Sequence, residues 1–125
     1  MQPPLDQRFN ELNICIVIPT YNNAGTIMQV IEAARSRCNH VMVINDGATD
    51  ATPDLLKSVE NEVILIGYSP NRGKGYALKT AFREAKKRGF DYVITMDSDG
   101  QHSVDDLPVF LDAIQQHPDS LLIGS

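Results

Sequence analysis

The stretch ICIVIPTYNN at residues 14–23 decides the fold class, because a continuous apolar run leads directly into a polar loop. A run of Ile and Val that does not alternate with polar residues is typical of a strand buried on both faces. We therefore predict such a strand over Asn13–Pro19. Further short apolar runs predict four more strands, at His40–Asn45, Val63–Gly67, Tyr92–Met96 and Ser120–Ile123.

Segments of helical period separate these strands. Apolar residues recur along one face between residues 27 and 34, and a helix is expected after Thr52-Pro53, with Thr52 as its N-cap. The clearest helix spans about Lys74–Arg88, and another is expected at Asp106–His117. Strands alternating with helices predict an α/β fold, with a mostly parallel sheet covered by helices on both faces.

The composition excludes several classes of protein. The chain has 125 residues and a formal net charge of −5, which indicates one domain and argues against general binding to nucleic acid. Its apolar runs are too short to cross a bilayer, and its N-terminus does not resemble a secretory signal. Cys15 and Cys38 are interpreted as reduced thiols of a cytosolic protein.

The segments that follow the first four strands are all polar. In parallel sheets, ligands bind beyond the carboxyl ends of the strands. The loops after the first, second and fourth strands should therefore share one crevice. The polar segments are residues 19–23, 46–50, 68–75 and 97–102.

Asp97-Ser98-Asp99 is the first candidate for chemistry. Two carboxylates at this spacing repel each other unless a cation or hydrogen-bond donors compensate, and their hard oxygens suit Mg²⁺ or Mn²⁺. Gln101 lies close enough to add a ligand. The alternative is a solvated acidic turn, whereas an EF-hand is excluded because Gly and Glu are missing where its loop needs them.

Arg72 and Lys74 are two cations next to glycines at an expected helix N-terminus, a reasonable place for a diphosphate. The spacing does not match a P-loop, and the alternative is a loop whose glycines serve only the turn. Asp46, before Gly47, could accept from a base imide or a ribose hydroxyl. Thr49 and Asp50 are better explained as residues at a helix start.

Taken in order, these motifs resemble the family 2 glycosyltransferases, and most closely the branch of polyprenyl-phosphate mannosyl- and glucosyltransferases. The resemblance covers about residues 12–125 and leaves residues 1–11 as an N-terminal extension. It implies a GT-A fold with a Rossmann-like sheet. The residues that carry it are Val17-Ile18-Pro19-Thr20-Tyr21-Asn22-Asn23, Ile44-Asn45-Asp46-Gly47-Ala48-Thr49-Asp50, Asn71-Arg72-Gly73-Lys74-Gly75-Tyr76-Ala77 and Met96-Asp97-Ser98-Asp99-Gly100-Gln101-His102.

The resemblance also implies a reaction, in which a hexose moves with inversion from a UDP- or GDP-sugar to a polyprenyl phosphate or a glycan. It implies Mg²⁺ or Mn²⁺ as cofactor, with Asp97 and Asp99 as catalytic residues and metal ligands and Gln101 as a further ligand. The nucleotide-binding set that we predict is Pro19, Thr20, Tyr21, Asn22, Asp46, Gly47, Arg72, Gly73, Lys74, Asp97 and Ser98.

Members of this type are longer by roughly a hundred residues, which shape the acceptor site, as the resemblance implies. We therefore expect the chain to be the nucleotide-binding part of a longer protein, with any catalytic base outside it. The expected location is the cytoplasm, and for the full-length protein it includes the inner face of the cytoplasmic membrane. The alternative functions are a sugar-phosphate nucleotidyltransferase and a non-catalytic nucleotide-binding module.

Overall fold

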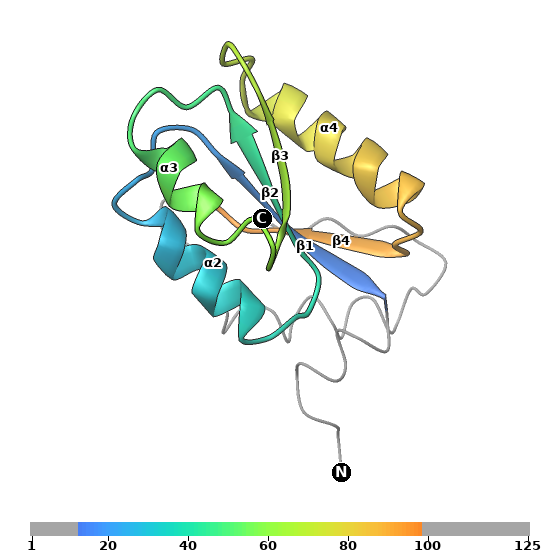
Figure 1. Cartoon of the computed structure of the whole chain (residues 1–125). Helices are drawn as coiled ribbons and strands as arrows, with labels where there is room; N and C mark the ends of the chain where they lie inside the picture. The colour runs from blue at the N-terminus through green and yellow to red at the C-terminus, as the bar shows by residue number, and fades with distance from the viewer. Residues whose placement is uncertain (1–12, 99–125) are drawn as a thin grey trace.

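The computed structural model describes residues 13–98, which form a parallel sheet with helices on both faces (Figure 1). Within these residues the sheet has four strands in the order β3-β2-β1-β4. Their bounds are Ile14–Thr20 for β1, Val41–Asp46 for β2, Ile64–Tyr68 for β3 and Tyr92–Thr95 for β4. The first four predicted strands are thus confirmed, each within about a residue at either end. The predicted strand Ser120–Ile123 and the predicted helix Asp106–His117 lie outside the described residues.

Strand β1 is central to the sheet and pairs with neighbours on both sides. It pairs with β2 from Ile16 opposite Val41 to Thr20 opposite Asn45, and with β4 as far as Val17 opposite Thr95. All seven residues of β1 are buried, as the apolar run predicts. Because every pairing is parallel, the carboxyl ends of the strands lie at one edge of the sheet.

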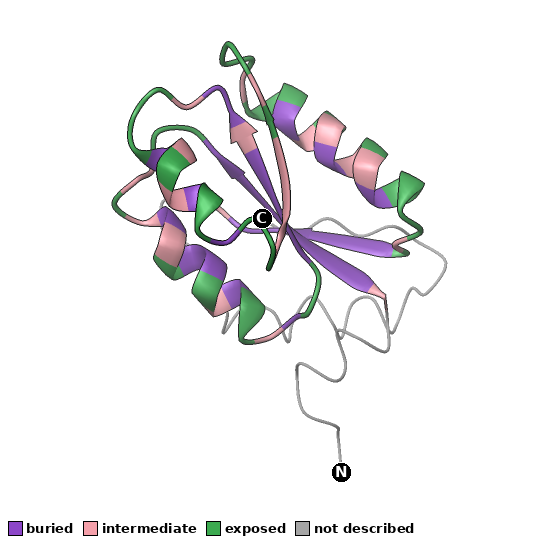
Figure 2. Cartoon of the chain, in the orientation of Figure 1, coloured by how far each residue is buried: buried purple, intermediate pink, exposed green. Residues whose placement is uncertain are grey.

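Each face of the sheet has its own hydrophobic core. Helices α2 (Ile27–Arg35) and α3 (Thr52–Lys57) cover one face, and α4 (Lys74–Lys87) covers the other (Figure 1). Alternate residues of β1 point into the two cores, with Ile16 on the α2 side and Val17 on the α4 side. Figure 2 shows the buried strands between helices whose outer surfaces are exposed. The prediction of helices on both faces is confirmed.

Helix α4 packs on the sheet through alanine side chains. Ala77, Ala81 and Ala85 are each at most 1% exposed, and they recur every fourth residue on one face of the helix. Gly89 follows the helix with a φ of +86°, the left-handed conformation that favours glycine and commonly ends a helix. The predicted helix and its glycine stop are confirmed.

The prediction that Thr52 caps α3 is wrong, because the helix begins at Thr52 and Ala51 occupies the N-cap position. Pro53 lies in the first turn, where its missing N–H costs nothing.

Both cysteines are free and buried, as expected. Burial raises the pKa of Cys15 to about 12 and also raises the pKa of Cys38, so both stay protonated near neutral pH. None of the helices in residues 13–98 is long and apolar enough to span a membrane.

Candidate functional site

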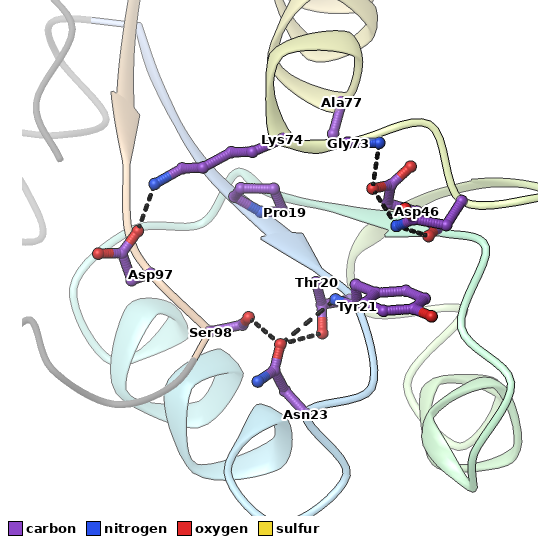
Figure 3. Close-up of a pocket in the computed structure, with 11 residues that line it drawn as sticks. Pro19, Thr20, Tyr21, Asn23, Asp46, Gly73, Lys74, Ala77, Asp97 and Ser98 are labelled. Carbon is purple, nitrogen blue, oxygen red and sulfur yellow. Dashed lines mark hydrogen bonds and ion pairs between the residues drawn. The ribbon is translucent and has the colours of Figure 1, made fainter.

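A pocket of about 420 Å³ lies at the carboxyl ends of the strands, where loops from four parts of the sequence meet (Figure 3). The predicted crevice between the loops after β1, β2 and β4 is confirmed, and the segment after β3 joins it. The lining residues are Pro19, Thr20, Tyr21, Asn23, Asp46, Asn71, Gly73, Lys74, Ala77, Asp97 and Ser98.

Asp46, the last residue of β2, is 4% exposed and binds the loop that precedes α4. Its carboxylate accepts hydrogen bonds from the backbone N–H groups of Arg72 at 2.9 Å and Gly73 at 3.0 Å. The side-chain amide of Asn71 donates to the same carboxylate at 2.7 Å and to the Asp46 carbonyl at 3.0 Å. These donors compensate the buried charge, so Asp46 holds residues 71–73 against the end of β2.

Gly47 allows this contact between the two loops. Its φ is +70°, and a Cβ at this position would lie 2.5 Å from the Pro70 carbonyl carbon and 2.7 Å from the Asn71 Cα. Real Cβ atoms do not approach backbone this closely. A residue without a side chain is therefore required where β2 turns beneath the 70–71 segment.

Lys74 and Asp97 form an ion pair across the pocket. The Lys74 Nζ lies 3.0 Å from the Asp97 Oδ1, and Figure 3 shows the two side chains pointing toward each other. The Lys74 side chain is 57% exposed and the Asp97 side chain 24% exposed. Lys74 is the first residue of α4. Because its side chain is largely exposed, it can change conformation and turn toward another anion in the pocket.

Asn23 connects the ends of β1 and β4. Its Oδ1 accepts from the Ser98 hydroxyl at 2.6 Å, and from the Thr20 hydroxyl and the Tyr21 N–H at 3.3 Å each (Figure 3). The Thr26 hydroxyl donates to the Ser98 carbonyl at 2.5 Å. Ser98 is therefore held through both its side chain and its backbone by the segment before α2.

The structure brings most of the described members of the predicted set into the pocket lining, but leaves Asn22, Gly47 and Arg72 out of it. The Asn22 Oδ1 accepts from the Thr49 N–H at 2.8 Å and so joins two loops. The Arg72 guanidinium lies 5.3 Å from the ring centroid of Tyr76 on the surface of α4. Asp99 and Gln101 lie outside the described residues.

The interpretation of Asp50 as a helix-start residue is confirmed. Its carboxylate accepts from the Thr52 N–H at 2.8 Å, at the beginning of α3. Hydrogen bonding by Thr52 lowers the pKa of Asp50.

Asn23, Asn71 and Ala77 line the pocket but were not among the predicted residues. Both asparagines stand in the polar segments that the sequence singles out. Nothing in the sequence separates them from asparagines that only stabilise a turn, because Ser98 and Asp46, which they bind in the pocket, are distant in the sequence.

The metal site stays a prediction. Residues 13–98 contain no group of three or more His, Cys, Asp or Glu side chains that could hold a metal ion. Asp97 is the described member of the predicted ligand set, and the ammonium group beside it shows that its carboxylate attracts a cation. The hard oxygens of Asp97, Asp99 and Gln101 are the donor type that Mg²⁺ and Mn²⁺ prefer, so the donor set fits.

Comparison with known proteins identifies relatives over most of the chain. The chain is 28% identical over 128 residues to a UDP-N-acetylglucosamine–dolichyl-phosphate N-acetylglucosaminyltransferase of Methanococcus voltae, with 90% of this chain and 51% of the relative covered. It is 29% identical over 116 residues to polyprenol monophosphomannose synthase of Mycolicibacterium smegmatis, with 88% and 43% covered. The chain thus spans about half the length of these curated relatives.

Solved structures of TarS from S. aureus share the fold. The match to TarS residues 1–349 has a TM-score of 0.66 at 21% identity and covers 85% of this chain and 33% of that one. The match to its complex with UDP-GlcNAc has a TM-score of 0.59 at 22% identity, with 85% and 32% covered. Together with the Rossmann-like parallel sheet, this likeness gives a GT-A-type fold.

The model of the family described as glycosyl transferase family 2 matches residues 15–125, almost the whole chain. This range contains every strand-end loop that forms the pocket. The chain therefore belongs to glycosyl transferase family 2.

Proposed function

We propose that the chain is the donor-binding part of a metal-dependent, inverting glycosyltransferase. The observation that carries the proposal is the pocket of a family 2 chain in which Lys74 and Asp97 face each other at the strand ends. The donor would be a UDP- or GDP-sugar, and the acceptor a polyprenyl phosphate or a glycan. Family membership favours this function over a nucleotidyltransferase or a non-catalytic nucleotide-binding module.

The relatives support both the proposed nucleotide-sugar donor and the proposed lipid-phosphate acceptor. Two of them have lipid phosphates or polyprenols in their names, and TarS has been solved with UDP-GlcNAc. A lipid-phosphate acceptor would bring the reaction to the inner face of the cytoplasmic membrane. Such an acceptor is already ionised and needs no general base, whereas a sugar hydroxyl would need one from outside the described residues.

The nucleoside would bind on the β1 side of the pocket. Tyr21 lines the pocket and is 45% exposed, so its ring is accessible for stacking on a base. The carboxylate of Asp46 already orders residues 71–73, and an N–H of the base or a ribose hydroxyl would add to the donors around it.

The diphosphate would bind between Lys74 and Asp97. Asp97, Asp99 and Gln101 would hold the divalent ion, which supplies Lewis-acid stabilisation of the diphosphate leaving group when bound. Lys74 would turn from Asp97 to the phosphates, where its charge stabilises the negative charge that develops during transfer.

Calorimetric titration of the chain with UDP and with GDP, each with and without Mn²⁺, tests the proposal. We expect metal-dependent binding of one of the two nucleotides, which would also identify the donor class. Binding that is unchanged by Mn²⁺ would contradict the metal site. Binding of neither nucleotide would contradict the donor-binding role of this chain.

Replacing Lys74 with alanine should weaken binding of the diphosphate more than binding of the nucleoside. A charge-assisted hydrogen bond contributes about 1.5–3 kcal/mol, so we expect a loss of about tenfold or more for UDP or GDP. The nucleoside should lose little, because Lys74 lies on the side of the pocket opposite Tyr21 (Figure 3).

Lys79→Ala is the matched control, because Lys79 is an exposed lysine of the same helix outside the pocket lining. Calorimetry with the nucleoside and the diphosphate gives both affinities for each variant. Equal losses of the two ligands in Lys74→Ala would mean that the lysine does not face the phosphates.

A further inference from the structure

We propose that Asn23 is a positioning residue, which holds the Asp97-Ser98 segment in place against the loop after β1. The proposal rests on the proposed function, in which the nucleoside and the diphosphate bind at two sides of the pocket. Asn23 would connect these two sides. Asn23 would act through its amide oxygen, where hydrogen bonds from the two sides meet.

The strongest link of this oxygen crosses the pocket. The Ser98 hydroxyl donates to the Asn23 Oδ1 at 2.6 Å, whereas the two donors from residues 20 and 21 are at 3.3 Å. Asn23 and Ser98 are 75 positions apart in the sequence, so this bond is a tertiary contact that no local turn provides. The Thr26 hydroxyl holds the Ser98 carbonyl from the same side.

Burial makes the link costly to break. Ser98 is 7% exposed, so a hydroxyl that loses its acceptor there has little water to replace it. A buried polar group left without a partner costs about 1–3 kcal/mol, and the segment would relieve that cost by moving toward solvent.

A movement of Ser98 would also move the charged group next to it in the pocket. Asp97 is the adjacent residue, and its carboxylate meets the Lys74 Nζ at 3.0 Å. Displacing Ser98 therefore separates the carboxylate from the lysine and from the proposed phosphate position. The nucleoside side is less affected, because its two hydrogen bonds to Asn23 are longer, at 3.3 Å each, and because Tyr21 follows β1, which the sheet holds on both sides.

The test compares Asn23→Ala, Ser98→Ala and the double variant, with calorimetry of UDP and UMP, or of GDP and GMP, in the presence of Mn²⁺. We expect each single variant to lower the ratio of diphosphate to monophosphate affinity by about tenfold, the equivalent of about 1.4 kcal/mol. The double variant should lose little more than either single one, because both changes break the same link.

Ser58→Ala is the matched control. Its hydroxyl donates to the Leu55 carbonyl at 2.6 Å at the exposed C-terminal end of α3, outside the pocket lining, so its removal should leave both affinities unchanged. Additive losses in the double variant, or equal losses for both nucleotides, would overturn the proposal. Either result would mean that Asn23 and Ser98 act separately or only stabilise the fold.

A second measurement does not depend on any nucleotide. Hydrogen exchange of the amides of Asp97 and Ser98 should be faster in Asn23→Ala and unchanged in Ser58→Ala. The Met96 N–H, which donates to the Val17 carbonyl at 2.9 Å, serves as the protected reference. Unchanged exchange would overturn the positioning role, even if the chain binds nucleotides. Failure of the unaltered chain to bind UDP and GDP would contradict the proposed function, while the exchange result would still decide the role of Asn23.

Discussion

Replacing Gly47 with alanine is expected to lower the free energy of unfolding by about 3 kcal/mol, from the cost of a left-handed non-glycine residue and of forcing an extra carbon into a packed contact. The backbone at Gly47 has a φ of +70°, and the new Cβ would meet the backbone of Pro70 and Asn71. These atoms cannot yield as a flexible side chain would, so the 70–73 segment has to move away from β2. Binding of UDP or GDP should weaken at the same time.

Urea unfolding of Gly47→Ala and of the unaltered chain, followed by circular dichroism, measures this change as a shift of the midpoint urea concentration. Gly25→Ala is the matched control, because a Cβ there meets nothing within 4 Å and its φ is not in the left-handed region. An unfolding midpoint in Gly47→Ala equal to that of the unaltered chain would show that the close approach of the two loops is not needed for stability.

Replacing Asp46 with asparagine should have an effect of similar size. The Arg72 N–H donates to one carboxylate oxygen of Asp46, and the Gly73 N–H and the Asn71 amide donate to the other. An asparagine keeps a single acceptor oxygen, so its NH₂ group would face the donors of one of these two oxygens. Loss of hydrogen bonds to a charged group costs about 1.5–3 kcal/mol each, so we expect a stability loss of about 3 kcal/mol. Nucleotide affinity should fall with it, because residues 71–73 lose their anchor.

Unfolding in urea and calorimetry with UDP or GDP measure the two effects on Asp46→Asn. Asp54→Asn is the matched control, since Asp54 is exposed in the first turn of α3 and its charge contributes only about 0.3–1 kcal/mol there. If Asp46→Asn kept its stability but lost nucleotide binding, the carboxylate would serve the ligand directly rather than the loop.

The sequence predicted the sheet well because each strand contains a short apolar run. The order of strands and helices alone predicts parallel pairing, and β1 is buried throughout, as its Ile and Val residues require. The position of a helix start was less predictable. Thr52 has the side chain of an N-cap, but the helix begins one position earlier than a cap at Thr52 would allow, with the Asp50 carboxylate accepting the Thr52 N–H.

The meeting of the loops was also predictable, because parallel strands end at one edge. The direction of individual side chains was not. Arg72 and Lys74 are two residues apart, yet Lys74 faces the pocket and the Arg72 guanidinium lies over Tyr76. The turn at Gly73, with a φ of +94°, stands between the two cations. Asn23 and Asn71 acquire their roles from Ser98 and Asp46, which are distant in the sequence, so a local pattern does not contain these contacts.

The alanine face of α4 has a consequence for how the pocket can vary. Because Ala77, Ala81 and Ala85 are among the smallest side chains, they act as a thin spacer that sets the distance between the helix and the sheet. The distance between Lys74 and Asp97 is therefore set by the packing of α4 on the sheet rather than by a loop. Surface loops can change in length or composition while the distance between helix and sheet stays constant. A residue larger than alanine on this face of α4 would instead increase the distance between the Lys74 and Asp97 charges.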